Sequence, residues 1–134
     1  MNIDTLTLSC RARLFLIIAS LFGAIGVAAG AYASHGLSRW ASSAQIEYFQ
    51  LAVTYQLFHA ITLSVVCVLS VFINNRCLLL SQIGFVLGVF LFSGSLYLYV
   101  LTGIKAVAVF TPIGGLLLII AWLSMLLALL KNKN

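Results

Sequence analysis

The residue with the clearest chemical potential is a histidine inside an apolar stretch. His59 lies in a segment from about residue 50 to residue 73 that otherwise consists mainly of apolar side chains. In an α-helix, with about 100° between successive residues, several polar or small residues fall within about 60° of His59. These are Tyr48, Ala52, Tyr55, Gln56, Thr62 and Ser70, and Gln45 joins them just before the segment. Lipid does not accept such a polar stripe, so we expect it to face other helices or a wet cavity.

Hydroxyl groups on another segment lie at a similar expected depth and are candidate partners for His59. Ser93, Ser95 and Tyr97 precede the end of an apolar stretch near residue 101. We expect hydrogen bonds from this group across to His59, of the kind that join membrane helices at about 0.6–2 kcal/mol each. Proton or ligand handling by His59 is the alternative, because ionisable residues inside a membrane are functional candidates.

A serine beside a histidine could also support nucleophilic catalysis, in which the histidine removes the serine proton. No carboxylate is available in the apolar segments to orient the histidine, because the only acids, Asp4 and Glu47, lie outside them. His35 does not pair with His59 in a haem or metal site either, since His59 is expected about 12 Å deeper in the membrane. The three cysteines have no metal-binding spacing. We therefore expect no enzyme, no metal site and no cofactor.

The composition identifies the solvent in which these residues must fold. Of 134 residues, 63% are hydrophobic and 7% are charged, and the mean hydropathy is +1.20. Soluble domains carry about 45–50% apolar and about 25% charged residues. So few charges cannot cover a water-exposed surface, which excludes a soluble enzyme, a disordered tail and a nucleic-acid-binding domain. We expect the lipid bilayer, and no nucleic acid, as the partner.

Four apolar stretches must hold the polar residues in place. They cover residues 14–34, 50–73, 78–101 and 112–130. Each reaches the roughly 20 residues that an α-helix needs to cross a bilayer. The pattern predicts an all-α fold, an integral membrane four-helix transmembrane bundle that is one membrane domain over residues 1–134. Thr111 and Pro112 are typical of an N-cap followed by the first helical residue. A continuous helix from Ala106, kinked at the proline, is the alternative.

The distribution of positive charge predicts an orientation. One end of the predicted bundle collects Arg11, Arg13, Arg76, Lys131 and Lys133, and the other has Arg39 and Lys105. Because positive residues are enriched on the cytoplasmic side, we expect the N- and C-termini in the cytoplasm. Arg11, Arg13, the apolar run after them and Ala31-Tyr32-Ala33 near its end together imitate a cleavable signal peptide, but the run is longer than a typical signal core. We therefore expect an uncleaved anchor.

Glycines at helical spacing predict close approach between helices. Gly26 and Gly30 form a small-x-x-x-small pattern in the first stretch, and Gly84 and Gly88 repeat it in the third. Such patterns allow two helix backbones to approach closely. We expect these faces to pack inside one bundle, and a seam between two copies of the chain is the alternative.

Four motifs in sequence order resemble those of a known family. Residues 28–37 (AAGAYASHGL) are similar to the G-A-[FY]-x-x-H-G-L signature of the small YgdD- and YwdK-type membrane proteins, to which the animal transmembrane protein 256 is more distantly similar. The segments YQLFHA, FSGSLY and TPIGG, at residues 55–60, 92–97 and 111–115, match the same family. Ala33-Ser34 departs from the Gly-Ala that usually precedes the histidine, and the stretch before Arg11 is longer than usual. The resemblance implies a multi-pass protein of the bacterial inner (plasma) membrane, of uncharacterised activity.

The short loops and the lack of a solvent-exposed domain favour a non-enzymatic accessory or assembly protein. Its expected partner is a second copy of the chain or another membrane protein. The alternative is a small carrier or channel with a polar path along the His59 stripe. No Asp, Glu, Lys or Arg lies inside a predicted span, which disfavours proton-coupled export. We expect Trp122, in the middle of the fourth span, to serve packing.

Overall fold

Four long α-helices make up most of the chain. The computed structural model describes residues 9–73 and 75–131. Its helices are α1 (Cys10–His35), α2 (Ser43–Phe72), α3 (Arg76–Thr102) and α4 (Phe110–Lys131), with short 3-10 helices η2 (Leu37–Arg39) and η3 (Lys105–Val109) in two connections. All four α-helices are long and apolar enough to cross a membrane. The prediction of an all-α, four-helix membrane protein is therefore confirmed.

Side chains and a left-handed glycine define the helix ends. The Ser9 hydroxyl accepts from the amide of Ala12 at the start of α1. Ser42 and Gln45 form a capping box at the start of α2, so Gln45 serves the helix end. Gly103 ends α3 with a φ of 72°, a conformation that glycine adopts without the steric cost of a Cβ atom. Each connection thus begins or ends at a residue that satisfies free backbone groups.

The start of the fourth helix corrects a sequence prediction. Thr111 is not an N-cap, because α4 begins at Phe110 and continues directly from the 3-10 turn of η3. Pro112 is the third residue of α4, where its missing N–H costs nothing because the first four amides of a helix have no partner in the helix. The Thr111 hydroxyl instead lies 2.7 Å from that of Ser95. The start of α2 also differs, since residues 43–49, which precede the predicted apolar stretch at residues 50–73, are helical.

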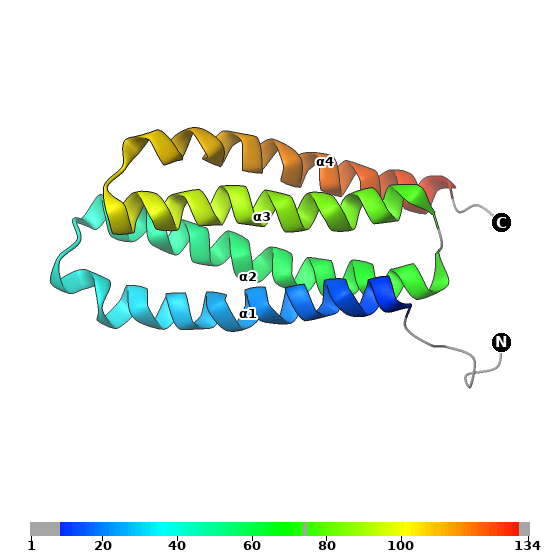
Figure 1. The fold of residues 1–134 in the computed structure, drawn as a ribbon, viewed down its shortest axis with the longest axis horizontal. Coiled ribbons are helices and arrows are strands. Elements are labelled where there is room, and N and C mark those ends of the chain that lie inside the picture. Colours follow the sequence, from blue (N-terminus) through cyan, green and yellow to red (C-terminus); the bar gives the residue numbers. More distant parts are fainter. Residues whose placement is uncertain (1–8, 74, 132–134) are drawn as a thin grey trace.

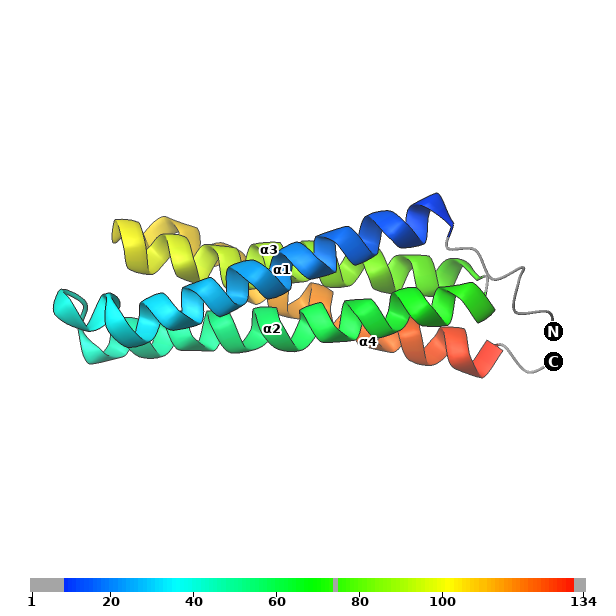
Figure 2. The same cartoon turned by 90° about the horizontal axis from the view of Figure 1, so that it is seen from below.

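The helices pack in chain order, with α1 at one edge and α4 at the other. The extensive contacts are those of α1 with α2, α2 with α3 and α3 with α4, an order visible in Figure 1. Seen from below in Figure 2, α1 runs obliquely across the neighbouring helices. The start of α1 and the end of α4 lie at the same end of the bundle, together with Arg11, Arg13, Arg76 and Lys131. Lys133, which also entered the charge count, lies outside the described residues.

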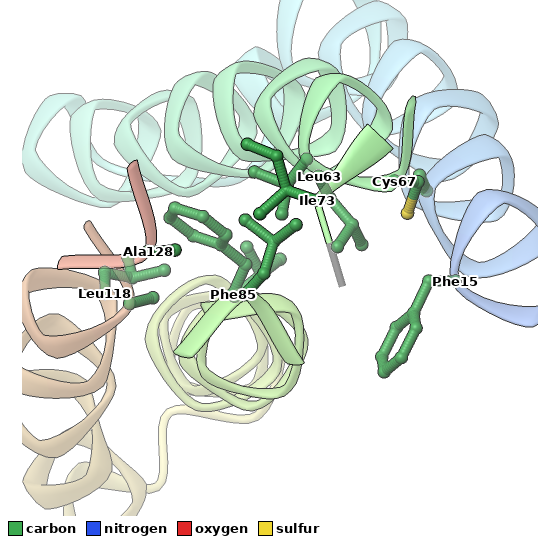
Figure 3. Close-up of a cluster of buried hydrophobic side chains, with 12 residues drawn as sticks. Phe15, Leu63, Cys67, Ile73, Phe85, Leu118 and Ala128 are labelled. Carbon is green, nitrogen blue, oxygen red and sulfur yellow. The ribbon is translucent and has the colours of Figure 1, made fainter. Parts of the chain in front are cut away.

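Two apolar clusters hold the helices together. The larger joins all four helices and includes Phe15 of α1, Leu63 of α2, Phe85 of α3 and Leu118 of α4 (Figure 3). The smaller lies near the η2 turn, where Leu37, Phe49 and Val100 are buried. The outer surface is also apolar, with side chains such as those of Ile61 and Phe90 more than two-thirds exposed. An apolar interior with an apolar surface is expected for helices surrounded by lipid.

The four predicted packing glycines all lie between helices of the same chain. A Cβ atom on Gly26 would lie 2.7 Å from the Leu57 side chain of α2, and one on Gly30 would lie 3.4 Å from Val53. A Cβ atom on Gly84 or Gly88 would lie 2.9 Å from Ala121 or 2.6 Å from Leu118, both on α4. The glycines therefore close two seams, one between α1 and α2 and one between α3 and α4.

Two adjacent glycines of α4 give a matched test of this packing. A Cβ atom on Gly114 would lie 2.8 Å from the Cα atom of Phe92 and 2.9 Å from the carbonyl oxygen of Gly88, whereas one on Gly115 would meet only the Phe92 ring, at 3.8 Å. We expect Gly114→Ala to lower the free energy of unfolding by about 1–3 kcal/mol, because backbone atoms cannot move aside. Gly115→Ala should be neutral or slightly stabilising. Reversible unfolding in detergent micelles, followed by circular dichroism, measures both; equal effects would contradict the packing described.

Candidate functional site

His59 is buried near the middle of α2 with both ring nitrogens in contact with polar groups. Its side chain is 5% exposed. The Nδ1 atom lies 2.8 Å from the carbonyl oxygen of Tyr55, one turn earlier. Because a carbonyl oxygen only accepts, Nδ1 must carry the proton of this bond. The indole N–H of Trp122 then donates to Nε2, with Nε1 and Nε2 3.3 Å apart. This pattern describes a neutral imidazole whose two nitrogens are both satisfied.

Aromatic rings surround the histidine on several sides. The ring centroids of Phe58, Phe85 and Trp122 lie 5.3, 5.6 and 6.3 Å from that of His59. The Tyr55 ring stacks on Phe92 of α3 with centroids 4.3 Å apart. These distances fall in or near the range in which aromatic rings attract one another beyond simple burial. Helices α2, α3 and α4 each supply part of this aromatic cluster.

A cleft of about 410 Å³ opens beside the cluster, and we call it the lateral cleft. Its lining residues come from α2, α3 and α4 and are Thr54, Tyr55, Phe58, His59, Phe92, Gly115, Leu118, Ile119 and Trp122. Phe58 and Ile119 are more than half exposed. They lie on the lipid-facing surface of the bundle, so the cleft can be entered sideways from the bilayer. None of the lining side chains carries a formal charge at neutral pH.

A second cleft provides a useful contrast. It has a volume of about 510 Å³ and lies between α3, η3 and α4, where Phe90, Gly94, Leu98 and Phe110 contribute to its lining. Ser95 also lines it, but the Ser95 hydroxyl is held by the Phe92 carbonyl and the Thr111 hydroxyl. This apolar cleft is larger than the lateral cleft, yet it offers no histidine or tryptophan nitrogen. The lateral cleft is therefore distinguished by its chemistry and not by its size.

The expected hydrogen bonds from the α3 hydroxyls to His59 are not formed. The Ser93 hydroxyl donates to the carbonyl oxygen of Ala52, 2.8 Å away. Ser95 is held as described above, and the Tyr97 hydroxyl is buried without a hydrogen-bond partner among the described residues. Serine in a helix has backbone carbonyls within reach, so it does not need a side-chain acceptor. The partner of His59 is instead Trp122, which the sequence assigned to packing alone.

The predicted polar stripe of α2 divides between two sides of that helix. Gln56 donates to the carbonyl oxygen of Phe22 in α1 at 2.7 Å and joins these two helices. Thr62 donates to the Phe58 carbonyl of its own helix. Tyr55 and His59 line the lateral cleft. The stripe therefore contributes separate contacts rather than one continuous row of free polar groups.

His35 lies away from this arrangement. It occupies the last turn of α1 with an exposed side chain and does not line the lateral cleft. Within residues 9–73 and 75–131, no three His, Cys, Asp or Glu side chains come together as metal ligands. Of the predicted site residues, the structure brings His59 and Tyr55 together and places Gln56, Ser93, Ser95 and His35 elsewhere.

Four of the residues that sequence reasoning missed lie on α4. Gly115, Leu118, Ile119 and Trp122 all line the lateral cleft. Their spacing of three, one and three residues places them on one helix face. That spacing is visible in the sequence, but an apolar helix in lipid gives no sign of which face meets a neighbour.

Fold and site together define a class of protein, a small multi-pass α-helical membrane protein with an aromatic cleft open to lipid. Residues 29–115 match the family described as a protein of unknown function, DUF423. The chain belongs to this family, and the resemblance to YgdD-type proteins is confirmed.

Several relatives match almost the whole chain. A UPF0382 membrane protein of Staphylococcus aureus is 36% identical over 89% of this chain and 97% of its own length. A UPF0382 membrane protein of Haemophilus influenzae is 35% identical over 90% of this chain and 96% of its own length. The UPF0382 inner membrane protein YgdD of Escherichia coli is 33% identical over 91% of this chain and 93% of its own length. No solved structure matches the chain.

The tautomer of His59 is a testable consequence of its two contacts. We expect ¹⁵N nuclear magnetic resonance of histidine-labelled protein in nanodiscs to find Nδ1 protonated and Nε2 unprotonated, as the carbonyl of Tyr55 requires. Trp122→Phe should shift the Nε2 resonance and lower the free energy of unfolding by about 0.5–1.5 kcal/mol, because the donor is lost while the ring is kept. The exposed His35 is the internal control, and its resonances should not move. A His59 protonated on Nε2 alone would refute the assignment.

Proposed function

We propose that this protein is a non-enzymatic membrane accessory protein that takes up a lipid-soluble small molecule in the lateral cleft. One observation carries the proposal: a cleft of about 410 Å³ opens toward lipid and has a histidine–tryptophan pair and stacked aromatic rings in its walls. Ligand sites typically combine mostly apolar walls with a few placed polar groups in volumes of about 300–1,000 Å³. The lateral cleft matches this description in volume, in lining and in polar content.

The lining favours an uncharged molecule that contains a flat ring. No charged side chain lines the cleft, and a charged ligand at this depth would be costly without a partner. Tyr55 and Phe92 form a stacked wall on which a further ring can pack. The Thr54 hydroxyl donates to the carbonyl of Gln50, which leaves its oxygen free to accept a hydrogen bond from the ligand.

The proposal of a non-enzymatic role is supported by how the candidate catalytic groups are engaged. Both nitrogens of His59 have partners within the chain. The hydroxyls of Ser93 and Ser95 are directed to backbone carbonyls and to Thr111. A nucleophile needs a base within hydrogen-bond reach, and neither serine has one among these contacts.

The carrier or channel alternative has less support from the contacts of α2. A conducting path needs polar groups that exchange partners along its length, whereas Gln56 and Thr62 each have a backbone partner. A homo-oligomer or another membrane protein remains the predicted partner of an accessory protein. Because the Escherichia coli relative is named an inner membrane protein, we propose the same membrane for this chain, with both termini in the cytoplasm.

Binding of 1-naphthol, an uncharged and flat bilayer-soluble ring, tests the proposed function. Equilibrium dialysis of the labelled compound against protein in nanodiscs, with empty nanodiscs as the partition blank, measures saturable binding. We expect about one molecule per chain, and Gly115→Leu should weaken binding at least about tenfold, or ~1.4 kcal/mol. The added side chain would project into the cleft, while its Cβ atom makes only ordinary contact with Phe92.

The apolar cleft supplies the matched control. A Cβ atom on Gly94 would have no atom within 4 Å, so Gly94→Leu adds the same group to the larger cleft without disturbing the bundle. Naphthol binding should be unchanged in this variant. Equal loss in both variants, or binding to wild type no greater than to the blank, would refute the proposal.

A further inference from the structure

A small notch lies at the end of the bundle where α1 and α3 begin, remote from both clefts. It has a volume of about 150 Å³ and is lined by Arg11, Asn75, Arg76 and Leu79. Arg11 belongs to the first turn of α1, and Arg76 is the first residue of α3. Two arginines far apart in the sequence therefore line one small space, at the end of the bundle where α1 begins and α4 ends (Figure 1).

The charged side chains that the described residues place at this end of the bundle are all positive. Arg13 and Lys131 lie at the same end of the bundle. Among residues 9–73 and 75–131 the only acidic side chain is that of Glu47, which lies near the start of α2 at the opposite end. An anion placed between two like charges lowers the repulsion between them. The amides in the first turn of each helix add partial positive charge at the same place.

Asn75 makes the notch a built feature of the bundle. Its side-chain nitrogen donates to the carbonyl oxygen of Ala128 in α4 at 3.1 Å, and its side-chain oxygen accepts from the amide of Leu78 at 2.9 Å. Asn75 therefore caps α3 and joins it to α4 at the same time. The backbone of the next residue, Arg76, is held in a fixed position beside α1.

The size and lining of the notch suit a phosphate group. Its volume of about 150 Å³ is several times the ~30 Å³ that a water molecule occupies in the liquid, so the notch is large enough to hold a phosphate group. Guanidinium groups present paired N–H donors that match phosphate oxygens. Leu79 adds an apolar wall, which suits the part of a phospholipid that continues toward the acyl chains.

We propose that Arg11 and Arg76 together bind a phosphate-type anion in this notch, supplied by the headgroup of an anionic phospholipid or by free phosphate. Basic pockets between membrane helices near the interface are known to bind anionic headgroups. The site is independent of the lateral cleft, since the two share no lining residue. Anion binding ties the start of α1 to that of α3, two helices without extensive contact of their own.

Native mass spectrometry of the intact chain in detergent tests the proposal, with dioleoylphosphatidylglycerol, dioleoylphosphatidylcholine and inorganic phosphate as the added probes. We expect one phosphatidylglycerol to be retained per chain at least tenfold more tightly than phosphatidylcholine. The double variant Arg11→Gln, Arg76→Gln should lose this preference. Arg11→Lys with Arg76→Lys should keep only part of it, because lysine cannot offer the paired donors of arginine.

The control is the double variant Arg13→Gln, Lys131→Gln, which removes the same charge from the same end but no residue that lines the notch. It should retain phosphatidylglycerol within twofold of wild type; equal loss in both double variants would overturn the proposal. Asp4→Asn should not change phosphatidylglycerol binding. Tighter binding in that variant would mean that the two arginines pair with Asp4 in the wild type, and this would also overturn the proposal. If added phosphate does not displace bound phosphatidylglycerol, the anion in the notch is a lipid headgroup. If the chain binds phosphate without preferring either lipid, and only the Arg11→Gln, Arg76→Gln variant loses this binding, the anion is free phosphate.

Discussion

A bilayer cannot form hydrogen bonds with a buried polar group, and this constraint determines how several polar side chains of the bundle are used. Ser93 donates to a carbonyl of α2, and Gln56 donates to a carbonyl of α1. His59 has a backbone carbonyl on one nitrogen and an indole on the other. Because an unsatisfied group costs several kcal/mol in hydrocarbon, these contacts fix the rotation of each helix about its axis. Polar residues thus determine which face of a helix packs against its neighbours, a choice that apolar side chains alone would not make.

The four helices could be predicted because a membrane imposes a minimum length on any apolar span. The ends of the helices were harder to predict, because Ser42 and Asn75, whose side chains cap α2 and α3, lie outside the apolar stretches. Thr111 had the appearance of a cap but failed as one, because Lys105–Val109 already forms a 3-10 turn that leads into α4. Whether a residue caps a helix therefore depends on the conformation of the residues before it. A two-residue motif such as Thr-Pro gives no information about that conformation.

The candidate site was only half predictable for a related reason. His59 and Tyr55 stand out because a polar residue in an apolar run needs a partner. Trp122 does not stand out, since a tryptophan is acceptable on any face of a helix in lipid. Its pairing with His59 depends on the rotation of α4 against α3, which the close packing of Gly88 against Leu118 also constrains. The position of Trp122 along its helix follows from the sequence, but the direction in which it faces around the helix axis does not.

The close seam and the lateral cleft have a common origin in one turn of α4. Gly114 lies against the backbone of Phe92, so α3 and α4 approach too closely there to leave room for a side chain at this position. The next residue, Gly115, points away from that contact and toward the gap beside α2, where it lines the cleft. A helix in which successive side chains are about 100° apart cannot bury both positions against one neighbour. The tight approach of α4 to α3 therefore leaves space beside α2, and the absence of a side chain at Gly115 keeps that space open.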